Sequence, residues 1–596
     1  MRNATQRNAT QRNATQRNAT QRRILSRAGD GSGPVRRAVA ALAAMTAASA
    51  AWAGPVEYRI VRFDVEFSTD DSEPIMSTDP DERIPDPVLG LGNRDRYASA
   101  AFGINADGVV VGMANVDFDG TNPIPGSDQF VSRPFVWQPE PIHAAFGVNT
   151  MHPLEWWATG DCEVFAHGAA FDVNSDGDVV GIAMRCDGDS PTPYRAFVWS
   201  PDSGLGHSAS AMIQLDPFGT TGASESAGAA SISNRLRGTG GEPATATAAG
   251  WQYDTTIQLE APYTFDVAAL TRTPLSVIPP SGGNFYETGR ASGIRPDPAG
   301  VEWTAGGLAE NSTRTTFCVD EAELLPIRWD GTILEQLPFM STSPPANSGV
   351  ARDVNDAGFV VGYVGDNSTP DCIRRAAYWP TPTQLELFAS NPANASDSTV
   401  AIATNAAGAT VGSNLNTITA IRWALPSQYV DLNDVTDCPN CDLIALESAH
   451  DINDDGWIVG VARSLDQDDE VTQVGFLLVP LGSCPADVDR DGDVDATDLA
   501  LVQTATGACP PRAICWRDVN GDCHVDAADV QIVLQYLKTQ ACATNETLAA
   551  PLAAIWMASD GEQFLESDPD AAAVVESAYD PESQLTTFVN LLGVIE

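Results

Sequence analysis

The sequence is almost without lysine: Lys538 is the only one among 596 residues, and 33 lysines and arginines face 79 aspartates and glutamates. The formal net charge of −46 would repel nucleic-acid phosphates, so we expect no nucleic-acid partner. Beyond the N-terminal region, no stretch approaches the roughly 20 apolar residues that a membrane-spanning helix needs. The six histidines show no spacing typical of a metal site. These absences leave an acidic soluble protein, of the kind found among exported proteins, calcium binders and proteins of saline environments.

The first 53 residues have the features of a targeting segment rather than of a folded domain. A repeat of Asn-Ala-Thr-Gln-Arg fills residues 1–22, and Arg36-Arg37 then precede an apolar run over 38–51 and an Ala-Trp-Ala site at 51–53. A basic region, a short apolar region and an Ala-x-Ala site are typical of a secretory signal peptide. We therefore expect a secreted, extracellular or cell-surface protein; a retained anchor is the alternative.

One short phrase recurs along the chain. Its copy at 449–460 reads Ala-His-Asp-Ile-Asn-Asp-Asp-Gly-Trp-Ile-Val-Gly: a strand ending in Ile-Asn, a turn at Asp-Gly and a second apolar strand. Because aspartate and glycine tolerate positive φ, the phrase predicts a hairpin with a two-residue turn. Its seven copies, of which the third and fourth are degenerate, begin at residues 101, 170, 230, 291, 353, 403 and 449.

Each copy is followed by a strand that ends in or near an aromatic residue, and the units recur at intervals of roughly 50–70 residues. These partner strands lie at 133–137, 195–199, 249–251, 327–329, 377–379, 421–423 and 474–478. With a weaker strand such as 212–215, each unit has four antiparallel strands, the content of a propeller blade.

The last unit lacks a fourth strand, and the strand predicted at 56–67 has no unit of its own. Joining the two would close the ring and remove an exposed edge. We therefore predict an all-β, seven-bladed β-propeller over residues 54–482, closed by its N-terminal strand.

These repeats resemble the HAF-repeat extracellular proteins, whose repeat has the form Ala-x-x-Ile-Asn-x-x-Gly-x-Val-Val-Gly followed by His/Arg-Ala-Phe-x-Trp. The segment from Asp431-Leu432-Asn433-Asp434 through Gly460 is similar to that family's terminal repeat. The resemblance covers about 56–480 and implies an extracellular repeat protein. It implies no catalytic residues.

Two acidic twelve-residue loops follow, at 487–498 and 518–529. The first has carboxylates at positions 1, 3, 5, 9 and 12 and glycine at position 6, and the loops lead into helix-like runs at 499–505 and 530–538. Oxygen ligands at this spacing form the cage that Ca²⁺ prefers. Two loops in register argue against a chance match, so we expect two Ca²⁺ sites.

The paired loops resemble a type I dockerin, with aspartate at position 12 and no entering helix. The resemblance implies an α-helical module over 483–543 that docks to a cohesin-like protein or cell-surface scaffold. Carried over by position, it implies one ligand set of Asp487, Asp489, Asp491, Asp493, Asp495 and Asp498, and a second of Asp518, Asn520, Asp522, His524, Asp526 and Asp529. Asp493 and His524 would act through their carbonyls, and Asp495 and Asp526 through water.

The second loop departs from the dockerin pattern because Cys523 replaces the glycine of position 6, where positive φ is wanted. This departure weakens the second site or brings in a disulfide. The alternative interpretation of both loops is that calcium only folds a small stalk.

Export makes the eleven cysteines candidates for disulfides. Cys484 and Cys542 flank the loop module, and Cys509 and Cys515 bracket a Pro-Pro loop within it. The odd total leaves at least one thiol unpaired or intermolecular, and the connectivity stays open.

Catalytic signals are weak. Gly206-His207-Ser208-Ala209-Ser210 approaches a nucleophile elbow but lacks the final glycine and the strand–helix context. We interpret the repeat aspartates and asparagines as turn residues and the recurring tryptophans as blade core rather than a sugar platform.

The sequence thus predicts a secreted calcium-binding protein that binds or displays rather than catalyses. The alternatives are a dockerin-borne carbohydrate-active enzyme that degrades polysaccharide with a site in the propeller channel, and a purely structural surface protein. The acidic tail at 544–596 shows no functional motif.

Overall fold

The computed structural model describes residues 58–63, 99–116, 131–142, 148–154, 167–184, 186–187, 190–191, 194–215, 226–236, 244–254, 259–275, 286–296, 302–310, 324–330, 333–340, 349–366, 373–436, 443–465, 471–481, 484–489, 494–509, 514–521 and 524–539. The predicted signal peptide and the C-terminal tail lie outside these residues. Nearly all described residues belong to one compact unit, Glu57–Asp489 with Ala496–Gln535; residues 494–495 and 536–539 belong to another.

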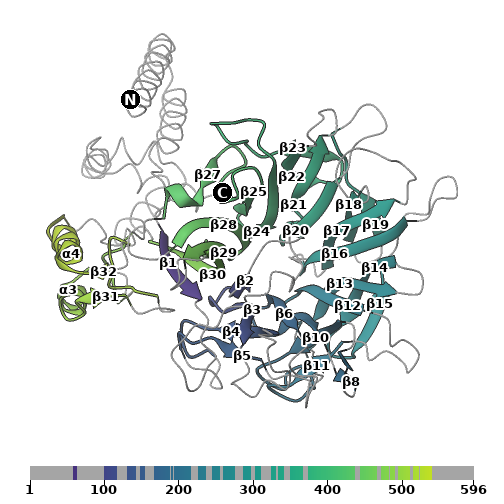
Figure 1. The fold of residues 1–596 in the computed structure, drawn as a ribbon, viewed down its shortest axis with the longest axis horizontal. Coiled ribbons are helices and arrows are strands. Elements are labelled where there is room, and N and C mark those ends of the chain that lie inside the picture. Colours follow the sequence, from purple (N-terminus) through teal and green to yellow (C-terminus); the bar gives the residue numbers. More distant parts are fainter. Residues whose placement is uncertain are drawn as a thin grey trace, which may run out of the picture. The chain divides into compact units, whose positions relative to one another are not determined.

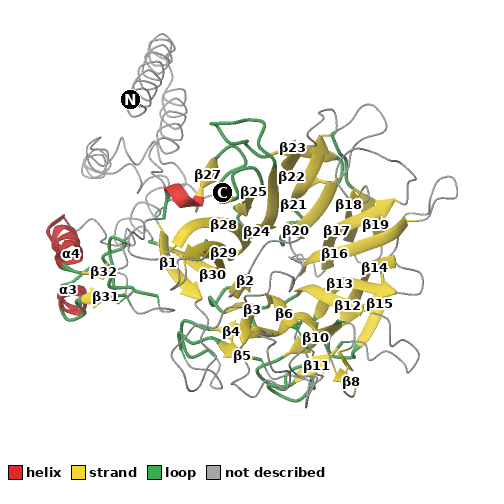
Figure 2. Ribbon diagram, in the orientation of Figure 1, coloured by secondary structure: helices red, strands yellow, loops and turns green. Residues whose placement is uncertain are grey.

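The larger unit is a seven-bladed β-propeller, which confirms the all-β, seven-bladed part of the predicted fold class (Figure 1). Strands dominate its described residues, and helices are few (Figure 2). The first strand of each blade contacts the first strand of the next, so these strands surround the centre. A single parallel bridge, Glu260 to Thr288, links the sheets of blades 3 and 4. None of the described helices is long and apolar enough to cross a membrane.

The first three blades follow one another in the chain. Their strands are, for blade 1, β2 (Ser99–Ile104), β3 (Val110–Val116), β4 (Val131–Trp137) and β5 (His152–Pro153); for blade 2, β6 (Gly168–Val173), β7 (Val179–Ala183), β10 (Arg195–Trp199) and β11 (Met212–Gln214), with a side hairpin of β8 (Cys186–Asp187) and β9 (Ser190–Pro191); for blade 3, β12 (Ser226–Ile232), β13 (Thr247–Asp254), β14 (Leu259–Asp266) and β15 (Thr271–Pro274).

The remaining blades repeat the same order. Their strands are, for blade 4, β16 (Tyr286–Pro296), β17 (Glu302–Glu310), β18 (Leu324–Asp330) and β19 (Ile333–Gln336); for blade 5, β20 (Gly349–Val354), β21 (Val360–Asp366), β22 (Ile373–Thr381) and β23 (Gln384–Leu387); for blade 6, β24 (Thr399–Thr404), β25 (Thr410–Asn414), β26 (Thr419–Trp423) and β27 (Tyr429–Asp431), then the short helix η2 (Leu432–Asp434); for blade 7, β28 (Leu443–Ile452), β29 (Ile458–Leu465), β30 (Val471–Pro480) and β1 (Tyr58–Phe63).

The fourth strand of blade 7 comes from the N-terminal side of the chain. β1 pairs antiparallel with β30, from Tyr58 opposite Pro480 to Phe63 opposite Gly475. On its other side, the Tyr58 amide donates to the Val435 carbonyl at 3.3 Å. The strand predicted over 56–67 is therefore paired with the last unit over its described residues.

The recurring asparagine builds the turn of the hairpin in the five blades that carry it. The Gly456 amide donates to the Asn453 carbonyl at 3.0 Å, and the Asn453 side-chain oxygen accepts from the Trp457 amide at 2.9 Å. In this turn only Gly456 has positive φ, +78°. The predicted two-residue turn, with positive φ at Asp455 as well, is wrong: the turn begins at the asparagine and glycine alone takes the left-handed position.

The same asparagine also joins its blade to the next one. Its side-chain nitrogen donates to the carbonyl of the equivalent residue of the neighbouring blade, in the pairs Asn105–Asn174 (2.9 Å), Asn174–Ser233 (3.0 Å), Asn355–Asn405 (3.1 Å), Asn405–Asn453 (3.1 Å) and Asn453–Asn105 (3.0 Å). The last pair connects blade 7 to blade 1. The turn-forming role is confirmed, whereas this bond between blades was not predicted.

The glycine that ends each phrase marks a close approach of two strands. A Cβ added to Gly460 would lie 2.0 Å from the Ser448 carbonyl oxygen, and one added to Gly250 would lie 2.0 Å from that of Gly228. Gly250 therefore occupies the second strand of blade 3, where β13 pairs with β12 and β14. Our assignment of 249–251 to the third strand is wrong, because Ala-Gly-Trp resembles a partner strand in composition but carries the second-strand glycine.

The core lies between neighbouring blades. The largest buried side chains are tryptophans at the ends of third strands, each at most 2% exposed: Trp137, Trp199, Trp329, Trp379 and Trp423. Burial of large aromatic rings is the main source of stability in such a sheet-on-sheet core. Their interpretation as core rather than as a ligand platform is confirmed.

The bonds of Asn453 predict a large effect on stability. Replacing Asn453 by alanine removes its turn bond and its bond to blade 1 at a buried site, and should cost about 2–4 kcal/mol in the free energy of unfolding. Urea denaturation of the full chain measures this loss. Asn416→Ala is the control, because Asn416 is exposed although its side chain accepts from the Ser398 amide at 2.7 Å. Equal midpoints for both variants would contradict a stabilising role for the bond between blades.

Candidate metal centre

Two loop–helix units follow β30. They comprise α3 (Ala496–Gln503), β31 (Gly507–Ala508), β32 (His524–Val525) and α4 (Ala527–Thr539), with β31 paired to β32. Both helices begin three residues earlier than the sequence indicated. Asp498 and Asp529 therefore lie in first turns, where the positive end of the helix dipole stabilises a carboxylate.

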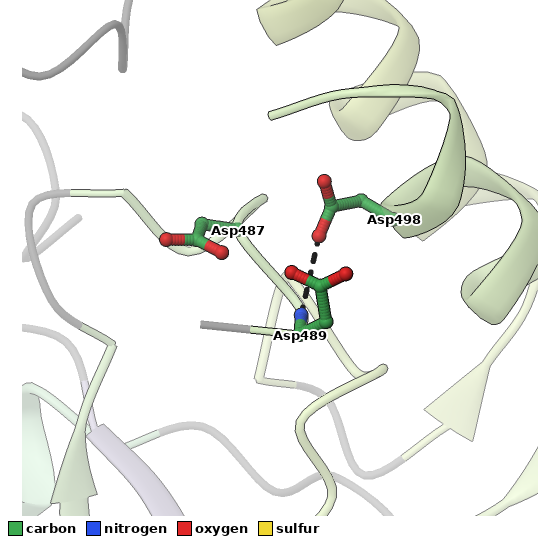
Figure 3. Close-up of side chains that lie close together, drawn as sticks. All are labelled: Asp487, Asp489 and Asp498. Carbon is green, nitrogen blue, oxygen red and sulfur yellow. Dashed lines mark hydrogen bonds between the residues drawn. The ribbon is translucent and has the colours of Figure 1, made fainter. Parts of the chain in front are cut away.

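The first loop brings three carboxylates together (Figure 3). One oxygen from each of Asp487, Asp489 and Asp498 lies within 4.8 Å of the others. Asp498 is fully buried, Asp487 is half-buried and Asp489 is exposed. Asp498 Oδ1 accepts from the Val488 amide at 2.6 Å and from the Asp489 amide at 3.2 Å. These bonds fix the position-12 carboxylate against the start of the loop.

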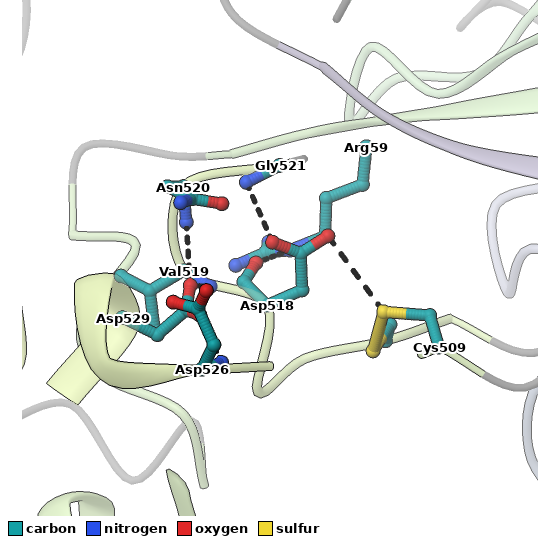
Figure 4. The surroundings of a disulfide bond; sticks show 9 residues. Arg59, Cys509, Asp518, Val519, Asn520, Gly521, Asp526 and Asp529 are labelled. Atoms are coloured by element: carbon teal, nitrogen blue, oxygen red, sulfur yellow. Dashed lines mark hydrogen bonds between the residues drawn. A yellow bond between two sulfur atoms is a disulfide. The ribbon is translucent and has the colours of Figure 1, made fainter. Parts of the chain in front are cut away.

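The second loop repeats the bonds from two loop amides to the position-12 carboxylate (Figure 4). Asp529 Oδ1 accepts from the Val519 amide at 2.7 Å and the Asn520 amide at 3.1 Å, the same two loop positions as in the first loop. Its other oxygen accepts from the Asp526 amide at 2.8 Å. Asp518 is buried, and its Oδ1 accepts from the Gly521 amide at 2.8 Å.

Of the first predicted ligand set, the structure unites Asp487, Asp489 and Asp498. Asp495 is described as exposed, while Asp491 and Asp493 lie outside the described residues. In the second set, Asp518 and Asp529 accept hydrogen bonds from loop amides, and the amides of Asn520 and Asp526 donate to Asp529. His524 lies in β32. Asp522 lies outside the described residues, as does Cys523. Among the described residues, a group of three carboxylates close enough to share a metal ion is found in the first loop and not in the second.

The donor set suits a hard cation. Three carboxylates this close repel one another unless a cation or a proton intervenes. Carboxylate and carbonyl oxygens are the ligands that Ca²⁺ takes, usually six to eight of them. The three described carboxylates of the first loop could therefore hold a hard cation, and Ca²⁺ is of this class.

A disulfide lies beside the second loop. Cys509 and Cys515 are bonded, with their Cα atoms 5.6 Å apart, and Cys509 Sγ is 3.7 Å from Asp518 Oδ2 (Figure 4). Cys484 is also disulfide-bonded. Cys542, which flanks the module at its other end, lies outside the described part of the chain.

Arg59 of β1 is a neighbour of the second loop that no sequence pattern predicted. Its Nε donates to the Asp518 carbonyl at 2.8 Å, although the two residues are 459 positions apart in the chain. Burial lowers the pKa of Arg59 to about 10, and the carboxylates of Asp518 and Asp529 oppose this shift. No local pattern in β1 signals this contact.

The propeller channel is the rival location for a site. Three aspartates lie on first strands, and the carboxylate of each accepts a hydrogen bond of 2.9 Å from a backbone amide of the next blade. The pairs are Asp172 with Ile232, Asp353 with Thr404 and Asp451 with Ile104. These aspartates join neighbouring blades. The Gly206–Ser210 segment is a turn region of blade 2, and His207 Nε2 lies 2.8 Å from the Val267 carbonyl oxygen.

Comparison with known proteins gives fold-level likeness alone. No family model and no curated protein matches the chain. Among solved structures, the chain is similar to a streptogramin B lyase, with 9% identity over 50% of this chain and 90% of that one at a TM-score of 0.23. A puromycin-hydrolysing peptidase of Mycobacterium tuberculosis is 12% identical over 64% of this chain and 50% of that one, at a TM-score of 0.33. The polysaccharide lyase Uly1 is 6% identical over 71% of this chain and 98% of that one, at a TM-score of 0.32. Likeness at these TM-scores assigns no activity to this chain.

Proposed function

We propose that the protein is an exported calcium-binding protein that acts by binding or display, with its loop–helix module docking to a partner protein. The observation that carries this proposal is the matched geometry of the two loops. In each, the buried position-12 aspartate accepts amides from positions 2 and 3, and the first loop gathers three carboxylates within 4.8 Å. A loop framework shared in this way supports a common ligand rather than two unrelated acidic turns.

Calcium would link the loop start to the helix in each unit. Asp487, Asp489 and Asp498 would hold the first ion, and Asp518, Asn520 and Asp529 would contribute to the second. The ion supplies charge neutralisation and ligand geometry, not a reaction step. The disulfide at Cys509–Cys515 supports an oxidising location and therefore export.

The docking role rests on the exposed start of each helix. Ala496, Thr497, Ala527 and Ala528 are exposed, and small side chains there permit the close approach of another backbone. The partner we propose is a cohesin-like protein or a cell-surface scaffold. The propeller would then be the displayed part, with polysaccharide as one class of ligand.

Calorimetry of the full chain tests the calcium sites. We expect binding with a Kd of about 10⁻⁷–10⁻³ M, and Asp487→Ala and Asp518→Ala should each weaken binding at one loop. Asp455→Ala is the matched control, because Asp455 is an exposed aspartate in a propeller turn. Absence of binding heat at millimolar Ca²⁺ would refute the proposal.

Docking predicts calcium-dependent retention on an immobilised cohesin domain. Ala528→Arg should abolish retention because a long charged side chain blocks close approach, while the calcium heat stays unchanged. Retention equal to wild type, or retention that persists in excess chelator, would contradict this docking surface.

A binding role also predicts that no reducing sugar is released from common polysaccharides incubated with the full-length protein. Its physical basis is the engagement of the first-strand aspartates Asp172, Asp353 and Asp451 between blades. Sugar release that survives replacement of these aspartates by asparagine would place catalysis elsewhere. Any release that depends on them would establish the enzyme interpretation instead.

A further inference from the structure

Two of the apolar clusters between neighbouring blades are equivalent in position. The hairpin turn of blade 7 is followed by Trp457 and that of blade 5 by Phe359, and the amide of each donates to the side-chain oxygen of its turn asparagine, at 2.9 and 3.0 Å respectively. Trp457 packs against the cluster between blades 7 and 1, and Phe359 packs against the cluster between blades 5 and 6. The two rings therefore occupy the same place in the repeat.

The loop module covers the first of these clusters. Ile514, only 9% exposed, belongs to the cluster between blades 7 and 1. The ring of Trp516 lies 6.2 Å from that of Trp457, and the Arg59 guanidinium carbon lies 5.6 Å from the Trp516 ring centre. An aliphatic residue and an indole two positions apart thus cover this place, with a guanidinium beside the indole.

The second cluster has two aromatic rings at the same place. The Phe359 and Tyr378 ring centres are 5.3 Å apart, and both side chains are half-buried. Tyr378 lies opposite Val361 in its sheet, where blade 7 has Leu477 opposite Val459. Among the described residues, every member of this cluster comes from blades 5 and 6. In the described part of the chain, no segment covers these rings as the module covers blade 7.

The rim of the Phe359–Tyr378 surface is acidic. The Tyr378 hydroxyl donates to Glu386 Oε2 at 2.7 Å, and Glu386 is exposed on β23. Phe388 packs on Tyr378 from the buried side, with the ring centres 4.9 Å apart. Because the whole protein has a formal charge of −46, a partner with cationic groups is attracted to this surface, whereas an acidic partner is repelled.

We propose that the Phe359–Tyr378 surface of blade 5 is a docking site for a partner protein segment that carries an aromatic residue next to a basic one. The aromatic ring packs on the two rings of blade 5, as the indole of the loop module packs on Trp457, and the basic group pairs with Glu386. Aromatic and arginine side chains are the groups that contribute most to binding at such surfaces. This docking site needs neither calcium nor docking of the module, and so goes beyond the function proposed above.

A peptide with the sequence of residues 512–517 tests the docking site, because it repeats the segment that covers blade 7. The probe is Arg-Ala-Ile-Ser-Trp-Arg, with the substitution Cys515→Ser. Saturation-transfer NMR with the full-length protein in excess chelator should show transfer to the indole protons, with a Kd of about 1 mM or below. A Trp516→Ala peptide, and a peptide with glutamate in place of both arginines, should bind about tenfold more weakly or not at all.

Variants of the propeller locate the binding. Tyr378→Ala should weaken it by about 2- to 10-fold, the effect of one aromatic contact, and Glu386→Gln by about 2- to 5-fold, the effect of one exposed charge pair. Glu386→Gln alters an exposed group alone, so its effect is separate from any loss of folding. Leu387→Ala is the matched control, because Leu387 is 39% exposed on the same strand but lies on the opposite face of the sheet from Glu386. It should leave the affinity unchanged.

Three outcomes would overturn this docking site. One is peptide binding that is equal in the wild type and in Tyr378→Ala and Glu386→Gln. Another is the absence of transfer at millimolar peptide, which leaves the calcium proposal standing because calorimetry tests that separately. The third is binding of a neutral oligosaccharide that Tyr378→Ala abolishes, without peptide binding, which would assign the surface to a sugar.

Discussion

The propeller depends on one repeated hydrogen bond, the bond from an asparagine side chain to the backbone carbonyl of the next blade. The asparagine oxygen closes its own turn, so the side chain has no rotational freedom left when its nitrogen reaches across. Asn453 makes this bond to Asn105 and so connects the last blade to the first. Buried amide groups of this kind are costly to leave unpaired, which makes the turn and the junction between blades a single structural unit.

The two degenerate repeats show what happens where this unit is missing. Blades 3 and 4 carry Ser233 and Arg295 in place of the asparagine. Asp172 of blade 2 accepts from Ser231 Oγ at 2.7 Å and from the Ile232 amide at 2.9 Å, and Asp353 and Asp451 accept from an amide of the next blade in the same way. The aspartates of the phrase therefore serve the same purpose as the asparagines, namely to satisfy backbone groups at the centre of the ring.

The loop module is continuous with this architecture rather than independent of it. Ile514 and Trp516 join the apolar cluster between blades 7 and 1, and Arg59 bonds to the loop backbone.

The sequence by itself determined the repeat, the number of blades and the two acidic loops, because each is encoded locally. Turn residues, apolar strands and ligand spacing act over fewer than about 15 residues, within reach of pattern analysis. Prediction from the sequence was wrong where two local patterns look alike. At Gly250, an Ala-Gly-Trp segment is a second strand and not a third. The predicted helices also began too far along the chain, because the observed helices begin inside the acidic loops, at Ala496 and Ala527.

The tertiary structure alone decided which distant groups meet. The bond between Arg59 and Asp518 and the bond between Asn453 and Asn105 each join residues more than 300 positions apart. Neither pairing leaves a local signal, since an arginine on an alternating strand and an asparagine in a turn look the same whether or not they have such partners. Ring closure brings these segments together, and the burial that follows makes their hydrogen bonds obligatory.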